Sequence, residues 1–186
     1  MRSLRPVILA AALLVVAAPG ATALQWNPQS TVTGPFSGVK TLSVGGISVS
    51  CTIGGNIVAS GAIAVTTDAT GRNAPPTWSA CSSTIAGSSC ATSSSPWTFT
   101  ATSTTTVTES PVNFVMKVGG CTTPLCTITV SGASIAGNGW SNTTHAITES
   151  PTARVTVSVS GSILCPRATS GTLTGTIAFP ATVTIT

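Results

Sequence analysis

The feature that most constrains the fold of this chain is an alternation of apolar and polar residues with a period of two. Residues 47–53 place isoleucine, valine and cysteine on one side of the alternation and serine and threonine on the other. Residues 155–159 repeat the pattern with valines. Because successive side chains of a β-strand point to opposite faces, such segments bury one face and leave the other in water. Helical spacing is not sustained anywhere after the N-terminal segment, so the pattern predicts an all-β fold.

Turn-forming residues separate the alternating segments, as in Gly45-Gly46 and Gly137-Asn138-Gly139. Short strands at regular intervals without helices are typical of an antiparallel β-sandwich or an open barrel. We also expect three disulfides to cross-link its strands and loops. We expect about ten strands, near residues 39–44, 46–53, 57–66, 76–80, 96–108, 111–119, 125–135, 143–148, 153–164 and 172–185.

Residues 1–23 have the organisation of a secretory signal peptide. Two arginines precede an apolar run over residues 7–18, and Ala21-Thr22-Ala23 has the small residues of a cleavage site. The apolar run is too short to span a bilayer, for which about 20 residues are needed. We expect cleavage after Ala23, no membrane insertion afterwards, and a single all-β domain over residues 24–186 that is secreted or held at the cell envelope.

Charge is scarce in this chain, since charged residues make up only 5% of it. Two of its seven lysines and arginines lie in the signal peptide, and the remaining five are scattered, which disfavours nucleic acid as a partner. The abundance of β-branched residues argues against a disordered chain. We therefore expect a folded domain. Its partner is not identified by the sequence, and contact with the cell envelope or an extracellular polymer is the option that these observations leave open. The five bases are Lys40, Arg72, Lys117, Arg154 and Arg167.

All six cysteines follow the signal peptide, and an even number in an exported chain indicates disulfides. A metal site would need thiolates at C-x-x-C spacing or thiolates assisted by histidines, and the sequence has neither arrangement, so we expect no metal and no cofactor. Cys51, Cys126 and Cys165 each fall in register with apolar neighbours, which predicts that their side chains point into the core. Sequential links across neighbouring elements are the preferred pairing: Cys51–Cys81, Cys90–Cys121 and Cys126–Cys165. The competing pairing joins Cys81 to Cys90 and Cys121 to Cys126, and leaves Cys51 with Cys165.

Few side chains could act as catalytic acids or bases, since the expected mature domain has one histidine and three acidic residues. His145 would have to be the base of any Ser-His-acid triad, but we interpret His145 and Glu149 as solvated residues beside a turn. Glu109 and Glu149 occur in the same tetrapeptide, Thr-Glu-Ser-Pro, and could form a glycosidase carboxylate pair at a shared rim. The tetrapeptide also suits a strand that exits into a turn without any chemistry. We predict that the protein is not an enzyme.

Tryptophans are the other candidates for a binding site. Trp97 shares its strand face with Phe99 and is expected in the core, whereas Trp140 follows Gly137-Asn138-Gly139 and is the best candidate for an exposed ring. We name Trp78 and Trp140 as candidate ligand-binding residues, with packing in the core or at turns as the alternative. Threonines at alternate positions, as in residues 98–108, could form an outward rank that matches an ordered surface, although threonine is also the favoured polar residue for a wet strand face.

Several runs resemble a group of uncharacterised exported proteins of actinobacteria. These runs are Val49-Ser50-Cys51-Thr52, residues 96–101, residues 126–132 and residues 175–186. The resemblance covers most of the mature chain, and it implies a secreted all-β protein without any established activity or functional residues. Cys90 and Cys121 are additional to the pattern of the group, which is a further reason to pair them with each other.

Three functions follow from these observations. The first is a non-catalytic structural or adhesive component of the cell surface or extracellular space, which the uncharged, Thr-rich, disulfide-linked chain favours. The second is a small-molecule or glycan-binding β-sandwich with a cleft near Trp78 or Trp140. The third is an enzyme, which requires His145 to be partly buried against a carboxylate with a serine in reach.

Overall fold

The computed structural model describes residues 23–28, 33–68 and 73–186. The expected signal peptide therefore lies outside the described residues, except for Ala23. The described residues form an all-β fold of thirteen strands. The strands are β1 (Trp26–Asn27), β2 (Thr33–Val44), β3 (Ile47–Gly61), β4 (Ala64–Asp68), β5 (Thr77–Ser83), β6 (Ser89–Thr92), β7 (Thr98–Ser103), β8 (Thr106–Val118), β9 (Cys126–Ser141), β10 (Ala146–Thr148), β11 (Arg154–Gly161), β12 (Ser170–Ala178) and β13 (Thr184–Ile185).

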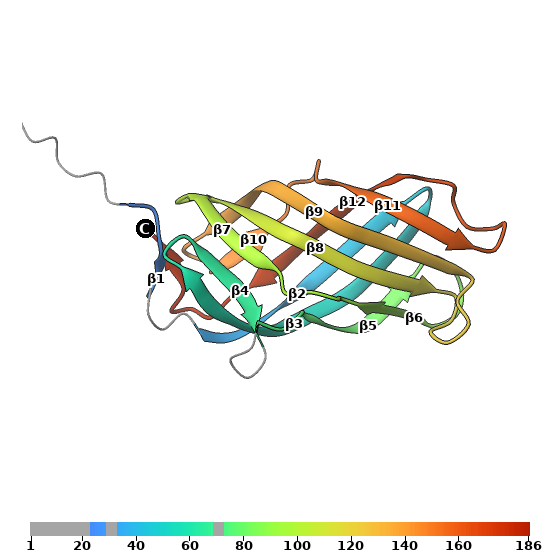
Figure 1. The fold of residues 1–186 in the computed structure, drawn as a ribbon, viewed down its shortest axis with the longest axis horizontal. Coiled ribbons are helices and arrows are strands. Elements are labelled where there is room, and N and C mark those ends of the chain that lie inside the picture. The colour runs from blue at the N-terminus through green and yellow to red at the C-terminus, as the bar shows by residue number, and fades with distance from the viewer. Residues whose placement is uncertain (1–22, 29–32, 69–72) are drawn as a thin grey trace, which may run out of the picture.

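The main sheet is antiparallel and closes on itself. Its strands follow one another as β2, β3, β4, β7, β8, β9, β11 and β12, and β12 pairs with β2 again. In Figure 1, β8 and β9 run across the front and β2 and β12 lie behind them, so the closed sheet has two facing layers. β10 takes the place of β11 between β9 and β12 at one end, while β5 and β6 extend the layers along β3 and β8. The predicted all-β antiparallel fold is confirmed, and its main sheet is closed where the sequence left a sandwich or an open barrel as the alternatives.

The core lies between the two layers and follows the predicted alternation. Along β3, for example, Val49, Cys51 and Ile53 are buried and the residues between them face outward. Aromatic rings fill much of the interior, with Phe179 in contact with Trp26, Phe36, Phe99 and Trp140. Burying one such large side chain contributes about 1.5–3 kcal/mol relative to leaving it exposed. The period of two therefore accounts for how the layers pack.

Two of the expected strands are in fact hairpins. The strand expected over 57–66 is interrupted at Ala62 and Ile63, between β3 and β4, and that over 96–108 is interrupted at Thr104 and Thr105. In the second hairpin, Ser103 Oγ accepts a hydrogen bond from the backbone N–H of Thr105 at 3.1 Å. Hydroxyl side chains that bond to nearby backbone favour turns, and this local effect outweighs the strand preference of threonine.

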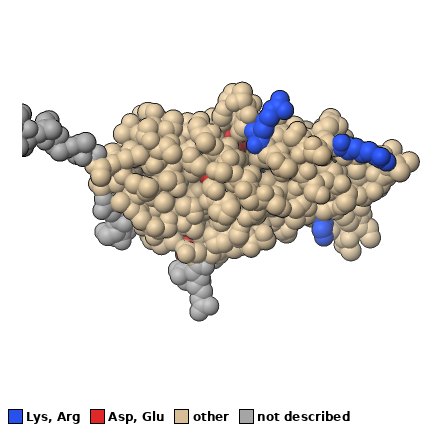
Figure 2. All heavy atoms as spheres, turned by 45° about the horizontal axis from the view of Figure 1, so that its top comes forward, with Lys and Arg blue, Asp and Glu red and all other residues tan. Residues whose placement is uncertain are grey.

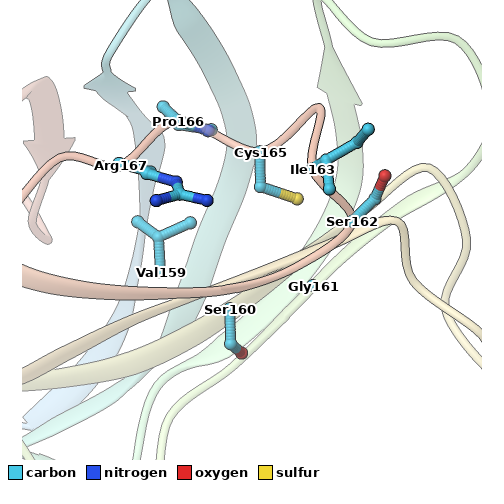
Figure 3. Close-up of a pocket in the computed structure, with 8 residues that line it drawn as sticks. All are labelled: Val159, Ser160, Gly161, Ser162, Ile163, Cys165, Pro166 and Arg167. Atoms are coloured by element: carbon cyan, nitrogen blue, oxygen red, sulfur yellow. The ribbon is translucent and has the colours of Figure 1, made fainter.

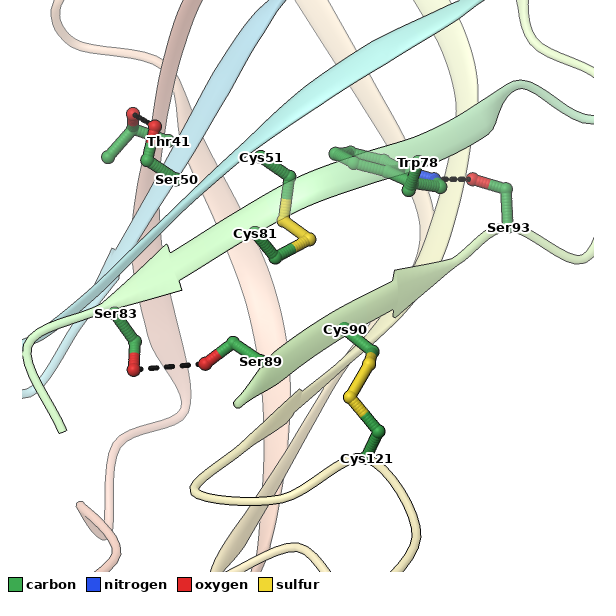
Figure 4. The surroundings of a disulfide bond; sticks show 10 residues. All are labelled: Thr41, Ser50, Cys51, Trp78, Cys81, Ser83, Ser89, Cys90, Ser93 and Cys121. Atoms are coloured by element: carbon green, nitrogen blue, oxygen red, sulfur yellow. Dashed lines mark hydrogen bonds between the residues drawn. A yellow bond between two sulfur atoms is a disulfide. The ribbon is translucent and has the colours of Figure 1, made fainter. Parts of the chain in front are cut away.

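The disulfides join Cys51 to Cys81, Cys90 to Cys121 and Cys126 to Cys165, which is the pairing preferred from the sequence. Figure 4 shows the first two linking β3 to β5, and β6 to the loop after β8. They span 30, 31 and 39 residues. Loops of that length correspond to about 3–4 kcal/mol each in the chain-entropy account.

The expected inward position of one cysteine is wrong. Cys51 and Cys126 are buried on their strands, but Cys165 is half-buried in the loop after β11. β11 ends at Gly161, whose φ of 128° is a conformation that side chains other than glycine rarely adopt. The apolar Ile163 that suggested a longer strand is 92% exposed.

Candidate functional site

A cluster of three charged side chains lies in the interior, where apolar residues are expected. Lys40 Nζ donates hydrogen bonds to Glu109 Oε2 at 2.7 Å and to Glu149 Oε1. The exposed fractions of the three side chains are 0%, 0% and 1%. Charged residues are almost never fully buried unless they are paired. This cluster is therefore the most unusual chemical feature of the described residues.

Lys40 reaches the interior because it occupies an inward position on β2, next to Gly175 of β12 in the register. A Cβ added at Gly175 would lie 3.2 Å from Lys40 Cδ and 2.2 Å from the carbonyl oxygen of Val39. Because Gly175 has no side chain, the methylene groups of Lys40 can pass beside it in the interior. The carbonyl oxygen of Gly175 also accepts a hydrogen bond from the backbone N–H of Glu149 at 2.9 Å. The same glycine therefore fixes two members of the cluster.

Glu109 approaches the lysine from the opposite layer, on β8, where it pairs with Phe99 of β7 and Ile135 of β9. Glu149 directly follows β10, at the point where that strand lies between β9 and β12. The two copies of Thr-Glu-Ser-Pro therefore deliver their glutamates to one lysine. The repeated tetrapeptide is a sequence signal of the site, although we did not predict Lys40 as the residue at which the two glutamates meet.

Asn138 connects the two glutamate-bearing segments. It is completely buried on β9, beside Val107 of β8 in the register. Its Oδ1 accepts a hydrogen bond from the backbone N–H of Ser150 at 3.3 Å, and its Nδ2 donates to the carbonyl oxygen of Ile135 at 3.3 Å. Because Ile135 pairs with Glu109 and Ser150 follows Glu149, this one amide holds both segments in place.

Burial dominates the electrostatics of the cluster. It raises the pKa of Glu109 from 4.5 to about 7, and the like charge of Glu149 adds to the increase while the Lys40 ammonium opposes it. Burial by itself would lower the pKa of Lys40, but the attraction of Glu109 and Glu149 outweighs it and the pKa lies above 10.5. The ammonium also lies 5.4 Å from the centre of the Trp97 ring, within the range of a cation–π contact. Lys40 is therefore held as a cation against two carboxyl groups.

Each carboxyl group uses only one of its oxygens in these contacts. Among the described residues, Glu109 Oε1 and Glu149 Oε2 are buried and have no hydrogen-bond partner. A buried polar atom without a partner costs about 1–3 kcal/mol. The cluster thus combines a strong contact with incomplete polar satisfaction, which is unusual for a purely structural arrangement.

The sequence interpretation of Glu149, Glu109 and His145 needs correction. Glu149 was expected to be solvated beside a turn, but it is 4% exposed because β10 and its flanking residues fold over the end of the core. Glu109 and Glu149 do come together, in the interior rather than at a rim. His145 is half-buried, and its Nδ1 lies 2.8 Å from the carbonyl oxygen of Val183 rather than against a carboxylate.

The expected exposure of Trp140 is also wrong. Its side chain is 5% exposed, packs edge-on against Trp26, and donates from Nε1 to Asn142 Oδ1. Trp78 is half-buried and donates from Nε1 to Ser93 Oγ at 2.7 Å, as Figure 4 shows. Both indole N–H groups are therefore occupied within the protein, and ligand binding at Trp78 or Trp140 stays a prediction.

A hollow of about 160 Å³ lies at the end of β11 and in the following loop, between Val159 and Arg167. Figure 3 shows that its lining includes Cys165, which the Cys126–Cys165 disulfide holds in place. Pockets for small molecules typically enclose about 300–1,000 Å³. This hollow is too small to suggest a ligand site by its volume.

The outer face formed by β12, β2, β3 and β5 is covered with hydroxyl groups, and we call it the hydroxyl face. One row across the strands contains Thr174, Thr41, Ser50 and Ser82, which are half-buried or exposed. Thr41 Oγ1 donates to Ser50 Oγ at 3.0 Å within this row (Figure 4). Neighbouring rows contain Thr172, Ser43 and Ser48, and Thr176, Val39, Thr52 and Ser79.

Charge is sparse on the exterior. In Figure 2, basic side chains stand apart on an otherwise uncharged surface, and acidic atoms show only as small spots. Of the bases in the described residues, Arg154 and Arg167 are exposed and Lys117 is half-buried. In the described part of the chain, no group of three or more His, Cys, Asp or Glu residues could hold a metal ion. No helix of these ranges is long and apolar enough to cross a membrane.

Comparisons of the chain with protein-family models, with curated proteins and with solved structures find no match.

Proposed function

We propose that the protein is an exported, non-catalytic structural or adhesive component of the cell surface or extracellular space, which contacts neutral, hydroxyl-rich polymer through the hydroxyl face. The observation that carries the proposal is the cross-strand row Thr174, Thr41, Ser50 and Ser82, with similar rows on both sides. Such rows offer hydrogen-bond donors and acceptors at the regular spacing of the strands.

The chemistry of the hydroxyl face sets the kind of partner. The rows named above contain no charged residue, and Arg154 of β11 adds a single positive charge beside Thr172. The face therefore offers little salt-sensitive attraction to an ionic polymer. Neutral hydroxyl groups, by contrast, exchange hydrogen bonds with a polysaccharide at many points, each contributing modestly. We therefore infer contact with a neutral polysaccharide and an affinity that salt hardly changes.

The construction of the domain supports a durable extracellular role. The closed sheet leaves few strand edges unpaired, and the three disulfides are typical of extracellular proteins. Durability of this kind suits a protein that stays in place as part of a surface or matrix.

The test is co-sedimentation of the oxidised mature protein with insoluble cellulose and chitin, at low and at high salt. We expect binding to at least one polymer that changes little with salt. Thr174→Lys should reduce binding at least several-fold, because it introduces a charged, bulky side chain into the central row of the hydroxyl face. Thr129→Lys is the matched control on β9, since Thr129 is also half-buried and faces outward but lies in the other layer.

Two results would contradict the proposal. One is a lack of sedimentation with either polymer. The other is equal loss of binding in Thr174→Lys and Thr129→Lys, which would remove any special role for the hydroxyl face.

A further inference from the structure

We propose that Lys40 and Glu149 become joined by an intramolecular isopeptide bond in the folded core, with Glu109 as the group that relays protons. This inference concerns the interior and is independent of the polymer contact proposed above. It rests on three side chains from β2, from β8 and from the segment after β10 that meet in a buried site.

The first requirement of such a bond is proximity, and the fold provides it. Lys40 Nζ is in hydrogen-bond contact with both carboxyl groups. Gly175 contributes in two ways. It leaves space for the Lys40 side chain, and its carbonyl oxygen accepts a hydrogen bond from the backbone N–H of Glu149. Groups held in reactive geometry reach effective concentrations of about 10⁵–10⁸ M, which greatly exceeds what is available between free amines and acids in water.

The second requirement is a group that can both give and accept a proton near neutral pH. Burial brings the pKa of Glu109 to about 7, the region in which a carboxyl group does both. Glu109 is hydrogen bonded to Lys40, and its carboxyl group is close enough to that of Glu149 for the two to interact electrostatically. It therefore connects the amine with the second carboxyl, which assigns Glu109 the relay and leaves Glu149 as the acyl group.

The bond-forming step balances without any further reactant. Protonated Glu109 gives its proton to the Glu149 carboxylate and accepts one from the Lys40 ammonium, which makes a neutral acid and a neutral amine. The Nζ lone pair then attacks the Glu149 carboxyl carbon and forms the C–N bond. The second proton lost by Nζ passes through Glu109 to the departing hydroxyl, the C–O bond breaks, and water leaves. Glu109 ends in its starting protonation state, and the net change is ammonium plus carboxylate to amide plus water.

The dry interior favours the product. Before the reaction, the core holds a cation and a carboxylate whose removal from water is costly even when they are paired. The amide is neutral, and Glu149 keeps one buried oxygen in place of two. The reverse reaction needs a water molecule to attack inside a completely buried site. The covalent bond would tie β2 to the β10 end of the sheet, where no disulfide is present among the described residues.

The test is the intact mass of the folded, oxidised mature protein by high-resolution mass spectrometry. We expect a mass lower than that calculated for three disulfides by one water molecule. After reduction and digestion with trypsin, cleavage at Lys40 should be absent, and a branched peptide should connect residues around 40 and 149.

Two variants test the assigned roles. Lys40→Arg keeps a cation that is not a nucleophile, and Glu109→Gln keeps the acyl group but cannot relay protons as a carboxyl group does. Both should show the full mass without loss of water. Lys117→Arg is the control on β8, because this lysine faces outward, and it should retain the loss of water.

The measurement on the unaltered protein decides the proposal even if a variant fails to fold. A full mass in folded, oxidised protein would overturn it. A deficit of one ammonia would identify an amide side chain such as Asn138 as the acyl group and would contradict the assignment to Glu149. A loss of water that persists in Lys40→Arg would place the modification elsewhere. None of these outcomes depends on whether the protein binds a polysaccharide.

Discussion

The buried cluster of Lys40, Glu109 and Glu149 and the hydroxyl face place polar groups in opposite ways within one small domain. The cluster places three ionisable side chains where the removal of charge from water is most costly, whereas the rows of the hydroxyl face hold neutral groups where charge would cost little. A buried ion pair is weak evidence for stability, because apolar side chains of similar size often do as well. The contrast motivates the two proposals, a covalent bond between the interior groups and contact of the hydroxyl face with a neutral polymer.

Replacement of Lys40 should have the largest effect on stability. Lys40→Met leaves two carboxyl groups buried without their partner, and loss of one member of a buried pair typically costs about 3–5 kcal/mol. Urea denaturation measures this loss. Lys117→Met on the outer face should change stability by less than about 0.5 kcal/mol. If the two variants are equally stable, the contrast between interior and exterior fails.

The next largest effect is on the pH dependence of stability. Folding raises the pKa of Glu109 from 4.5 to about 7, so between these values the folded state binds more protons than the unfolded state. Stability from this group is therefore present at low pH and falls as the pH rises through that window, by up to about 3 kcal/mol. Burial is the largest cause of the shift, so the sign is the same before and after an isopeptide bond forms.

Thermal unfolding of the parent and of Glu109→Gln between pH 4.5 and pH 8 measures this effect. The decline with rising pH should be smaller in the variant. The other groups that face Glu109 are Lys40, which titrates above this window, and Glu149. An equal or steeper decline in Glu109→Gln would show that Glu109 is not the source.

A smaller effect is expected at Gly175. Gly175→Ala places a Cβ 2.2 Å from the carbonyl oxygen of Val39 and 3.2 Å from Lys40 Cδ, so the backbone or the lysine stem must shift. Overpacking of this kind costs about 1–3 kcal/mol. Gly139→Ala is the matched control on β9, because the closest atom to its added Cβ is 3.8 Å away. Equal urea midpoints for the two variants would show that Gly175 does not help to position the cluster.

The smallest effect on stability is expected on the hydroxyl face. Thr174→Lys should change the free energy of unfolding by no more than about 0.5 kcal/mol, since surface substitutions away from special features rarely do more. Its effect should appear in polysaccharide binding instead. A large loss of stability in Thr174→Lys, measured by urea denaturation, would mean that this face serves packing rather than contact.

The sequence predicted the layers of the fold better than the site. The alternation in residues 47–53 and 155–159 reports which face is buried, because packing between layers imposes that period directly. The hairpin at Thr104 and Thr105 was missed because threonine serves both strands and hydroxyl-bonded turns.

The site was missed for a different reason. The local sequence around Glu109 and Glu149 is that of an exposed turn, and their burial depends on β10 folding between β9 and β12 and on the bridge made by Asn138. One signal was present, since Lys40 alternates with Leu42 and Val44 and so occupies a position on the buried face of its strand. A charged residue in such a position needs a partner of opposite charge, and the repeated Thr-Glu-Ser-Pro supplied two.

The most direct test of the account is a crystal structure of the mature protein at a resolution that separates individual side-chain atoms. We expect continuous electron density from Lys40 Nζ to the Glu149 carboxyl carbon, a planar amide with one remaining Glu149 oxygen, and Glu109 hydrogen bonded beside it. Separate side chains, with both carboxyl oxygens present on Glu149 and a free ammonium on Lys40, would contradict it.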